Sequence, residues 1–399
     1  MMNIAVLGAG NRARKYLSCL PKGVKVRCLV EPDPLRLELA SRMCGVPENG
    51  RYASSEAFFA SAHPSIKAVI VAAPDRLHVP LALLSISRGW HVLLEKPAAP
   101  SEAEYQMLMD AAAEAKVHVG VCLEMRFHPY FRRIRDLIAG GAIGDVTSVE
   151  HVEHIGPDRM AHTFVRGLWS RKQDAGPIFL SKCCHDADFL LWLVGGKVEE
   201  VSSEGRIGKF HAPAVRPMPV ELGQAGNPPL RCIDCSLEGC WYSAVHLYRD
   251  RKEWVSGFDV PDGSTLDEVI ERELREGRYG RCVYHCDNNV YDNQGVTARL
   301  SNGIVLNMAL EGITTHEGRM MVFHGTEGTL HADGGRITVT RSGGSSFQED
   351  YSDLAAQPLH AGADRLLVED FFQAIAEGRE PMATLASAFE GHRLCYLAD

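Results

Sequence analysis

The sequence predicts an α/β chain of two domains: a doubly wound parallel sheet, then an α+β domain whose open, mainly antiparallel sheet is covered by helices. Three observations predict it. At 399 residues the chain is too long for one typical hydrophobic core. Strand-like and helix-like stretches alternate up to about residue 122, and short strands separated by glycine turns dominate later. We therefore expect a first domain over residues 1–122 and a second over residues 123–399.

The first strand and the turn after it carry a nucleotide-binding motif. Residues 3–7 (NIAVL) form a short apolar run, as in a strand buried on both faces. The next six residues (GAGNRA) have the form G-x-G-x-x-A, in which the first glycine makes the tight turn and the second leaves room for a pyrophosphate. A helix that begins here offers free N–H groups to phosphates. The candidate cofactor-binding residues of this Rossmann turn are Gly8, Gly10, Asn11, Arg12 and Ala13.

The second predicted strand ends in an acid. Residues 24–30 form the strand, and Glu31 follows at the place where a carboxylate accepts a hydrogen bond from a ribose 2′-hydroxyl. Glu31 would repel a 2′-phosphate, so the sequence favours NAD over NADP. An ordinary glycine turn in an α/β domain is the alternative interpretation.

The other strands of the first domain are predicted over residues 68–72, 91–94 and 117–122, and its other helices over 78–88 and 101–115. Ligands of doubly wound sheets bind beyond the carboxyl ends of the strands. The residues after these strands should therefore face the same crevice as the glycine-rich turn. The candidates are Pro74, Asp75, His78, Glu95 and Lys96.

Lys96 is the first candidate catalytic residue. It lies in the tripeptide Glu95-Lys96-Pro97, directly after a buried strand. Burial beside a cofactor would lower its pKa and make it an acid or a base, or its ammonium group would hold a substrate hydroxyl. The alternative is an exposed lysine at the end of a strand.

The second domain is predicted to contain helices over residues 131–139, 181–194, 364–377 and 383–398, with strands over 146–153 and between 296 and 340. The region from about 205 to 287 is rich in glycine, proline, cysteine and charge. It is predicted to be an insertion with its own local order.

A second candidate catalytic group opens the helix over residues 181–194. Lys182, His185, Asp186 and Asp188 lie within two helical turns, and His185 shares a face with both Lys182 and Asp188. A histidine that titrates near neutrality suits proton exchange with an alcohol while a hydride leaves its carbon. The alternative is a polar helix start whose acids interact with the helix dipole.

Further residues could line a sugar site near this helix. His162, Arg166 and Trp169 lie just before it in the chain, and Arg126 follows the last strand of the first domain. We treat these four, together with Asp188, as candidate substrate residues. Aromatic side chains are more often part of a core.

A third candidate site is rich in cysteine. Cys232-x2-Cys235-x4-Cys240 is followed by Cys282-x3-Cys286. In a reducing compartment such short spacings favour a tetrahedral zinc site over disulfides. Four of these five thiols would suffice, with Cys282 or Cys286 as the spare. Free or redox-active thiols are the alternative, because the two halves lie far apart in sequence.

Charge and hydropathy exclude other classes of function. The formal net charge of −9 provides no basic surface for nucleic acid. No apolar run reaches membrane-spanning length, and no signal-peptide pattern precedes the first strand. We therefore expect a cytoplasmic protein whose partner is a small molecule, with neither nucleic acid nor membrane as a partner.

Together these stretches resemble the Gfo/Idh/MocA family, named for glucose–fructose oxidoreductase and inositol dehydrogenase. The matching segments are GAGNRA (8–13), APDRLH (73–78), EKP (95–97), MRFHP (125–129), GAIGDV (141–146), HDADFLLWLVGG (185–196) and GTEGTL (325–330). The resemblance implies a Rossmann domain, a C-terminal α/β domain and oxidation or reduction of sugars and cyclitols with NAD(P). It also implies a homo-oligomer, a dimer or a tetramer.

The resemblance assigns roles to two residues and exposes one departure. Lys96 matches the family's EKP lysine, and His185 matches the histidine of its D-x-x-x-H element. The position four residues before His185 is Ser181 rather than aspartate. The acid that usually accompanies the histidine is therefore missing from its place.

Three functions are compatible with these features. The first is an NAD-dependent oxidoreductase acting on a hydroxyl of a sugar, glycoside or cyclitol, with His185 taking the proton and Lys96 stabilising the alkoxide. The second is a glycoside hydrolase that keeps its NAD and passes through oxidation, elimination, hydration and reduction. The third is a non-catalytic sensor that binds NAD or a sugar, which the presence of both Lys96 and His185 disfavours.

Overall fold

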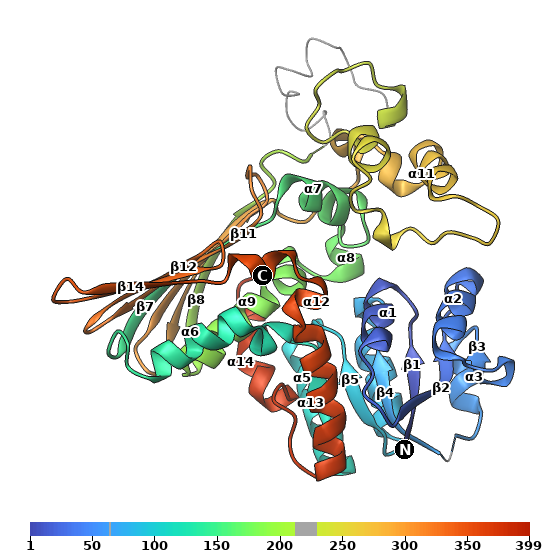
Figure 1. The fold of residues 1–399 in the computed structure, drawn as a ribbon, viewed down its shortest axis with the longest axis horizontal. Helices are drawn as coiled ribbons and strands as arrows, with labels where there is room; N and C mark the ends of the chain where they lie inside the picture. The colour runs from blue at the N-terminus through green and yellow to red at the C-terminus, as the bar shows by residue number, and fades with distance from the viewer. Residues whose placement is uncertain (64, 212–229) are drawn as a thin grey trace.

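The computed structural model describes residues 1–63, 65–211 and 230–399 (Figure 1). Its N-terminal part contains a six-stranded parallel sheet in the order β3-β2-β1-β4-β5-β6, which confirms the doubly wound Rossmann fold. The strands are β1 (Met2–Leu7), β2 (Val24–Val30), β3 (Arg51–Tyr52), β4 (Ile66–Val71), β5 (His91–Leu94) and β6 (Val119–Val121).

Three of the five described helices of this domain begin at a side-chain cap. The Asp33 side chain accepts a hydrogen bond from Arg36 N at the start of the second helix, and Ser101 accepts one from Glu104 N at the start of the fifth. The helices are α1 (Asn11–Ser18), α2 (Pro34–Cys44), α3 (Ser55–Ala60), α4 (His78–Ile86) and α5 (Glu102–Ala115). The elements α2, α3 and β3 had no counterpart in the sequence-based prediction.

The second sheet has eight strands in the order β14-β13-β12-β11-β7-β10-β9-β8. Only the β7–β10 pair is parallel, which confirms a mainly antiparallel sheet. The strands are β7 (Val146–His154), β8 (Val198–Arg206), β9 (Asn293–Leu300), β10 (Val305–Glu311), β11 (Gly318–Gly325), β12 (Gly328–Asp333), β13 (Arg336–Arg341) and β14 (Ser346–Asp350). Strand β8 was not predicted, because its polar residues leave only Val198 buried.

Helices cover one face of this sheet, and two of them return to the first domain. Phe371 of α13 and Leu385 of α14 lie in the two cores on either side of the parallel sheet, so the end of the chain completes the N-terminal domain. Outside the insertion, the described α-helices of this part are α6 (Pro129–Ala139), α7 (Pro157–Arg159), α8 (Lys172–Ala175), α9 (Ile178–Val194), α12 (Pro358–Ala361), α13 (Ala363–Glu377) and α14 (Leu385–Leu397).

The insertion forms a lobe above both domains in the view of Figure 1. Its described part contains α11 (Leu266–Arg275), which begins with a capping box at Thr265. Part of the expected insertion, residues 212–229, lies outside the described residues. A small core of its own holds the lobe, formed by Ala244, Leu247, Tyr248, Ile270 and Leu274. Across the described chain, we find no helix with the length and apolar character needed to cross a bilayer.

Candidate active site

The glycine-rich turn has room for a dinucleotide. Gly8 has φ +98°, and a Cβ there would lie 2.4 Å from the carbonyl oxygen of Ala72, so only glycine fits. A Cβ at Gly10 would meet no atom within 4 Å, which leaves space for a pyrophosphate. Glu31 lies beside this turn, because its Oε2 accepts a hydrogen bond of 2.8 Å from Ala9 N. The residues present therefore fit NAD.

Lys96 extends from the end of β5 to the helix that carries His185. Its Nζ donates a hydrogen bond of 2.7 Å to the carbonyl oxygen of Ser181 on α9. Burial alone would lower the pKa of Lys96, but the negative charge of Glu95 and Asp75 and the Cys184 sulfur together raise it. The expectation of a lowered pKa was therefore wrong. Lys96 is an ammonium donor at neutral pH.

Two buried histidines hold the turn that carries Lys96. The ring nitrogens of His78 lie 2.7 Å from Pro97 O and 2.9 Å from Ala73 O. On the opposite side, Nε2 of His392 accepts a hydrogen bond of 3.1 Å from Ala98 N. His78 was predicted to bind the cofactor, but its side chain is buried and ties two strand ends together.

Arg12 and Glu95, which were also predicted to bind the cofactor, form hydrogen bonds with other residues of the protein. Arg12 donates to Glu95 Oε1 and to Asp364 Oδ1, both at 2.9 Å, and the Tyr16 hydroxyl donates to the same Glu95 oxygen. Glu95 Oε2 in turn accepts from Lys96 N at 2.9 Å. These two predicted cofactor residues thus connect α1 to the Lys96 turn and to α13. Their side chains therefore hold these three elements together.

His185 lies on α9 with one ring nitrogen beside an acid. Its Nε2 is 3.6 Å from Glu124 Oε1, and its buried Nδ1 has no hydrogen-bond partner. Burial and the neighbouring Lys96 ammonium lower the pKa of His185 well below its ordinary value. The imidazole is therefore neutral at pH 7 and able to accept a proton.

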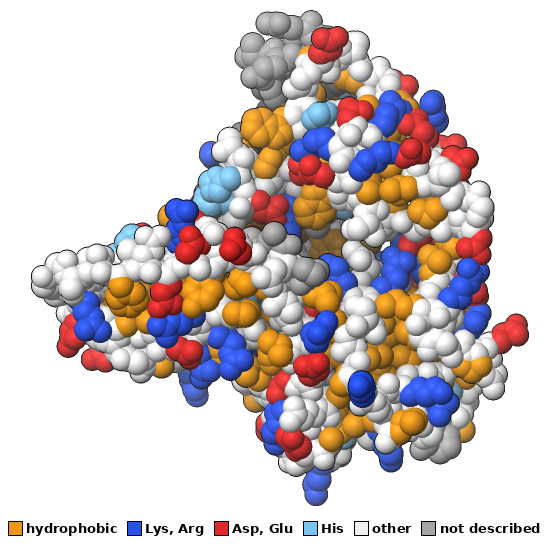
Figure 2. All heavy atoms as spheres, viewed as in Figure 1, with side chains coloured by type: hydrophobic (Ala, Val, Ile, Leu, Met, Phe, Trp, Pro, Cys, Tyr) orange, Lys and Arg blue, Asp and Glu red, His pale blue; other side chains and the backbone are white. Residues whose placement is uncertain are grey.

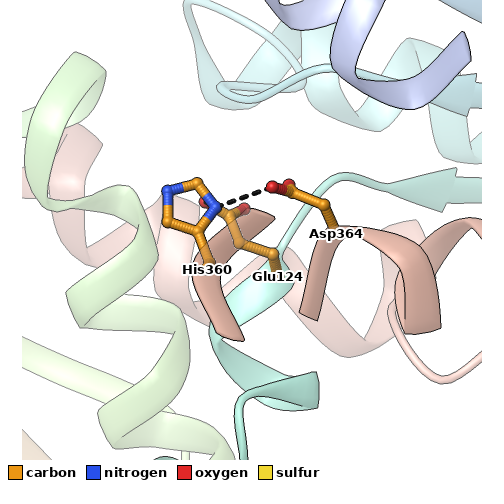
Figure 3. Close-up of side chains that lie close together, drawn as sticks. All are labelled: Glu124, His360 and Asp364. Atoms are coloured by element: carbon orange, nitrogen blue, oxygen red, sulfur yellow. Dashed lines mark hydrogen bonds and ion pairs between the residues drawn. The ribbon is translucent and has the colours of Figure 1, made fainter. Parts of the chain in front are cut away.

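Glu124 belongs to a second group of polar side chains, next to His185. Figure 3 shows it beside His360 and Asp364, whose side chains are 2.9 Å apart. The three offer possible metal-ligand atoms within 4.8 Å of one another. The Arg12 guanidinium lies 2.9 Å from Asp364 and already supplies positive charge, so we assign no metal here.

Lys182 and Asp186 lie on the other face of α9, toward the antiparallel sheet. Lys182 pairs with Glu153 of β7, and Arg319 of β11 bonds to Asp186 at 2.5 Å and to Glu153 at 3.0 Å. His151 Nε2 lies 3.1 Å from Asp186. Burial opposes ionisation of Asp186, but Arg319 and His151 lower its pKa well below the ordinary value. The predicted catalytic roles of Lys182 and Asp186 do not fit this geometry, because each pairs with an opposite charge in a buried network.

Three predicted substrate residues have no surface to offer a substrate. Arg126 and Asp188 have side chains only 1% and 2% exposed, and they form two hydrogen bonds of 2.8 and 2.6 Å with each other. Arg166 is fully buried and bonds to Arg281 O and Tyr242 O, both at 2.6 Å. These three predictions are corrected: the charges of Arg126 and Asp188 pair with each other, and Arg166 lies beneath the insertion.

Trp169 and His162 lie where the second domain meets the crevice and the lobe. Trp169 Nε1 donates to Asp75 Oδ2 at 3.0 Å and so connects the two domains beside the cofactor edge. His162 stacks on Tyr279 with ring centroids 4.4 Å apart, and its Nδ1 lies 2.9 Å from the Tyr248 hydroxyl. Burial lowers the pKa of His162 to about 4. Figure 2 shows the surface hollowed between the lobe and the N-terminal domain.

The sequence analysis missed Glu124. The residue comes shortly after β6, so the rule that parallel strands share a ligand-binding edge would have found it. His360 and Asp364 carried no comparable signal, because they reach the site from the other end of the chain. Pro74 is exposed at the end of β4 and Asn11 is exposed at the start of α1, as a cofactor-binding edge requires.

Two family models match the chain. One, described as an oxidoreductase family with an NAD-binding Rossmann fold, matches residues 2–123. The other, described as the C-terminal α/β domain of an oxidoreductase family, matches residues 135–398. The two matches follow the two sheets of the structure.

Individual proteins agree with these matches. "Putative oxidoreductase YteT" of Bacillus subtilis (strain 168) is 25% identical over 96% of this chain and 90% of its own length. Inositol 2-dehydrogenase of Corynebacterium glutamicum (strain R) is 24% identical, but over only 50% of this chain and 56% of its own.

Solved structures show the same fold. An oxidoreductase from Agrobacterium radiobacter in complex with NAD+, L-tartaric acid and magnesium has a TM-score of 0.70 at 16% identity, covering 100% of this chain and 96% of its own. The aldose-aldose oxidoreductase from Caulobacter crescentus has a TM-score of 0.65 at 17% identity, covering 100% and 97%. With the dinucleotide turn and the two sheets in place, the chain belongs to the Gfo/Idh/MocA family of NAD-binding oxidoreductases.

Proposed function

We propose that this oxidoreductase transfers a hydride between NAD and a carbinol carbon of a sugar, glycoside or cyclitol. The observation that carries the proposal is the approach of Lys96 to the helix of His185. Lys96 Nζ lies 2.7 Å from Ser181 O, and Ser181 precedes His185 by one turn of α9. This contact brings an ammonium of the first domain to the turn of α9 that precedes the imidazole of the second.

The two groups divide the acid–base work. Bound NAD supplies the hydride acceptor. Neutral His185 takes the hydroxyl proton, because burial and Lys96 keep its pKa low. Lys96 remains protonated and donates a hydrogen bond to the oxygen on which negative charge develops. Glu124, 3.6 Å from His185 Nε2, stabilises the imidazolium that forms and takes over from the acid absent at Ser181.

The proposal includes a preference for NAD over NADP. Glu31 lies at the end of β2 next to the glycine-rich turn, where its charge opposes a 2′-phosphate. We also propose a homo-oligomer that forms through the face of the eight-stranded sheet without helices. Multi-angle light scattering of the purified protein tests the oligomer, and NAD and NADP titrations test the preference.

A panel of polyols and glycosides with NAD tests the activity. Both the absorbance of reduced nicotinamide and the release of an activated aglycone are followed. Reduced cofactor in proportion to substrate supports the dehydrogenase. Aglycone release without net reduced cofactor would instead identify the redox-neutral hydrolase, and binding without either signal would identify a sensor.

A further inference from the structure

The insertion brings its two groups of cysteines together. Cys282 N donates a hydrogen bond of 2.8 Å to Leu230 O, and Arg231 and Arg281 form an antiparallel bridge. The Arg231 side chain donates to Gly277 O at 2.9 Å, which ties the same segment to the end of α11. Thiols that lie far apart in the sequence therefore lie in one part of the lobe.

Four of the five thiols share a cavity. It opens at the surface of the lobe, and its lining includes Cys232, Cys235, Cys240 and Cys282. Cys286 does not line the cavity. Its Sγ donates to Cys282 O at 3.4 Å, and both residues belong to the main core of the second domain, but of the two only Cys282 lines the cavity. The structure thus identifies Cys286 as the spare among the five.

We propose that Cys232, Cys235, Cys240 and Cys282 bind a structural zinc ion. Four thiolates in tetrahedral geometry are a common structural zinc site. No three of these described sulfurs lie within 4.8 Å of one another, so zinc binding requires the loop of residues 233–241 to move toward Cys282. Much of this loop lines the cavity and Trp241 at its end is 57% exposed, while Leu237 and Cys240 pack against the main core of the second domain.

Arg166 is an independent observation in favour of negative charge at this place. Its guanidinium is fully buried, its Nη2 donates to Cys232 Sγ at 3.5 Å, and its Nη1 has no hydrogen-bond partner. Its other partners are the carbonyl oxygens of Arg281 and Tyr242, which carry no full charge. A buried cation is costly without a counter-charge. Zinc with four thiolates carries a net charge of about −2, which Arg166 would partly neutralise.

A bound zinc ion would stabilise the lobe, because the hydrophobic core of the lobe is small. Its central cluster has five buried apolar residues, whereas other buried side chains of the described insertion, such as Tyr242 and Val283, belong to the core of the second domain, so the lobe has only a small core of its own. Metal binding adds folding free energy where a core is insufficient. This inference concerns the lobe and is independent of the proposed catalytic activity.

Metal analysis of the full-length protein, purified under reducing conditions, tests the proposal. We expect about one zinc per chain, as for a single tetrahedral site. Replacement of the ion by Co²⁺ should give the intense thiolate-to-cobalt absorption of a tetrahedral sulfur site. Cys232→Ser and Cys282→Ser should reduce the bound metal at least about tenfold, whereas Cys286→Ser should retain it.

Three outcomes would overturn the proposal. The first is wild-type protein without stoichiometric metal and without the cobalt spectrum. The second is a disulfide between any two of the four cysteines in the reduced preparation, found by mass spectrometry. The third is equal metal loss in all three variants. If the serine variants fail to fold, the wild-type stoichiometry and the cobalt spectrum still decide the question.

Discussion

The two faces of helix α9 place similar side chains in opposite situations. On the crevice face, His185 has a ring nitrogen without a partner and an acid 3.6 Å from the other. On the sheet face, the next residue, Asp186, bonds to Arg319 at 2.5 Å and is fully buried. Lys96 points to the first face, and Lys182 pairs with Glu153 on the second.

The difference shows how one helix can serve both catalysis and stability. Charges on the sheet face compensate one another, so their removal should affect folding. On the crevice face, His185 has no opposite charge of the described residues within hydrogen-bond distance, and its lowered pKa keeps it neutral and able to accept a proton. Adjacent residues of α9 therefore allow matched pairs of substitutions.

The largest expected effect separates His185 from Asp186. His185→Gln removes the proton acceptor and should lower kcat by about 10²- to 10⁴-fold without loss of fold. Asp186→Asn should leave kcat of the folded enzyme within a few-fold. It should lower the free energy of unfolding by about 3–5 kcal/mol, because it breaks a buried network. Steady-state kinetics and denaturant unfolding of both variants measure the two effects, and equal kcat losses would contradict the division of the helix.

The second comparison uses the two lysines. Lys96→Met should lower kcat by about 10²- to 10³-fold, because it removes the donor to the developing alkoxide, and should leave NAD affinity nearly unchanged. Lys182→Met is the matched control, with reduced stability as its main effect because Glu153 loses a partner. Turnover and fluorescence titration with NAD measure both. Full activity of Lys96→Met would remove Lys96 from the mechanism.

The pH dependence of kcat/KM tests whether the pKa of His185 is lowered and whether Lys96 contributes to the lowering. The pKa of His185 is lowered, so its neutral form persists below pH 6.5 and the acid limb of kcat/KM should lie below that value. Lys96 contributes to this lowering, so Lys96→Met should raise the pKa of His185 and move the acid limb of the residual activity upward. NMR titration of the ring confirms the direction. An acid limb at the same pH in both proteins would disprove the coupling.

Local signals placed residues 8–13 and Lys96 at strand ends, where the structure also has them, but gave no sign of the pairing of buried charges. Residues 8–13 carry their function in a contiguous motif at a strand end, and Lys96 likewise follows directly after β5. Arg126 and Asp188 form an ion pair although they are 62 residues apart in the sequence, and neither segment has a pattern that predicts this contact. Helix α9 is buried on both sides, so hydrophobic periodicity could not tell the face of His185 from that of Asp186.

The same limit applies to the fold. The sequence predicted the helices now seen as α13 and α14 but assigned them to the second domain, because they lie at the end of the chain, far in sequence from the parallel sheet that they cover. Helix α13 packs closely against β6, because a Cβ at Gly120 of this strand would lie 2.8 Å from the ring of Phe371. The predicted domain boundary near residue 122 therefore separates the two sheets, but it does not separate the hydrophobic cores, because α13 and α14 belong to the cores of the first sheet.

The smallest expected effect concerns the lobe and the cofactor. Asp259 of the insertion lies 2.6 Å from Arg14 and 2.8 Å from Arg36, on the helices that follow β1 and β2. The contact occupies two arginines, of which Arg36 lies near Glu31, and we expect them to attract a 2′-phosphate once they are freed. Asp259→Asn should therefore lower KM for NADP about two- to fivefold with little change for NAD, the size expected of a partly exposed ion pair.

Asp262→Asn is the matched control for this last comparison. It breaks only the exposed pair with Arg42 on the same side of the lobe, at 2.7 Å, and should change neither KM. The ratio of kcat/KM for the two cofactors, measured for both variants, isolates the effect of freeing Arg14 and Arg36. An unchanged ratio in Asp259→Asn would mean that these arginines do not reach the ribose, and that Glu31 alone sets the preference for NAD.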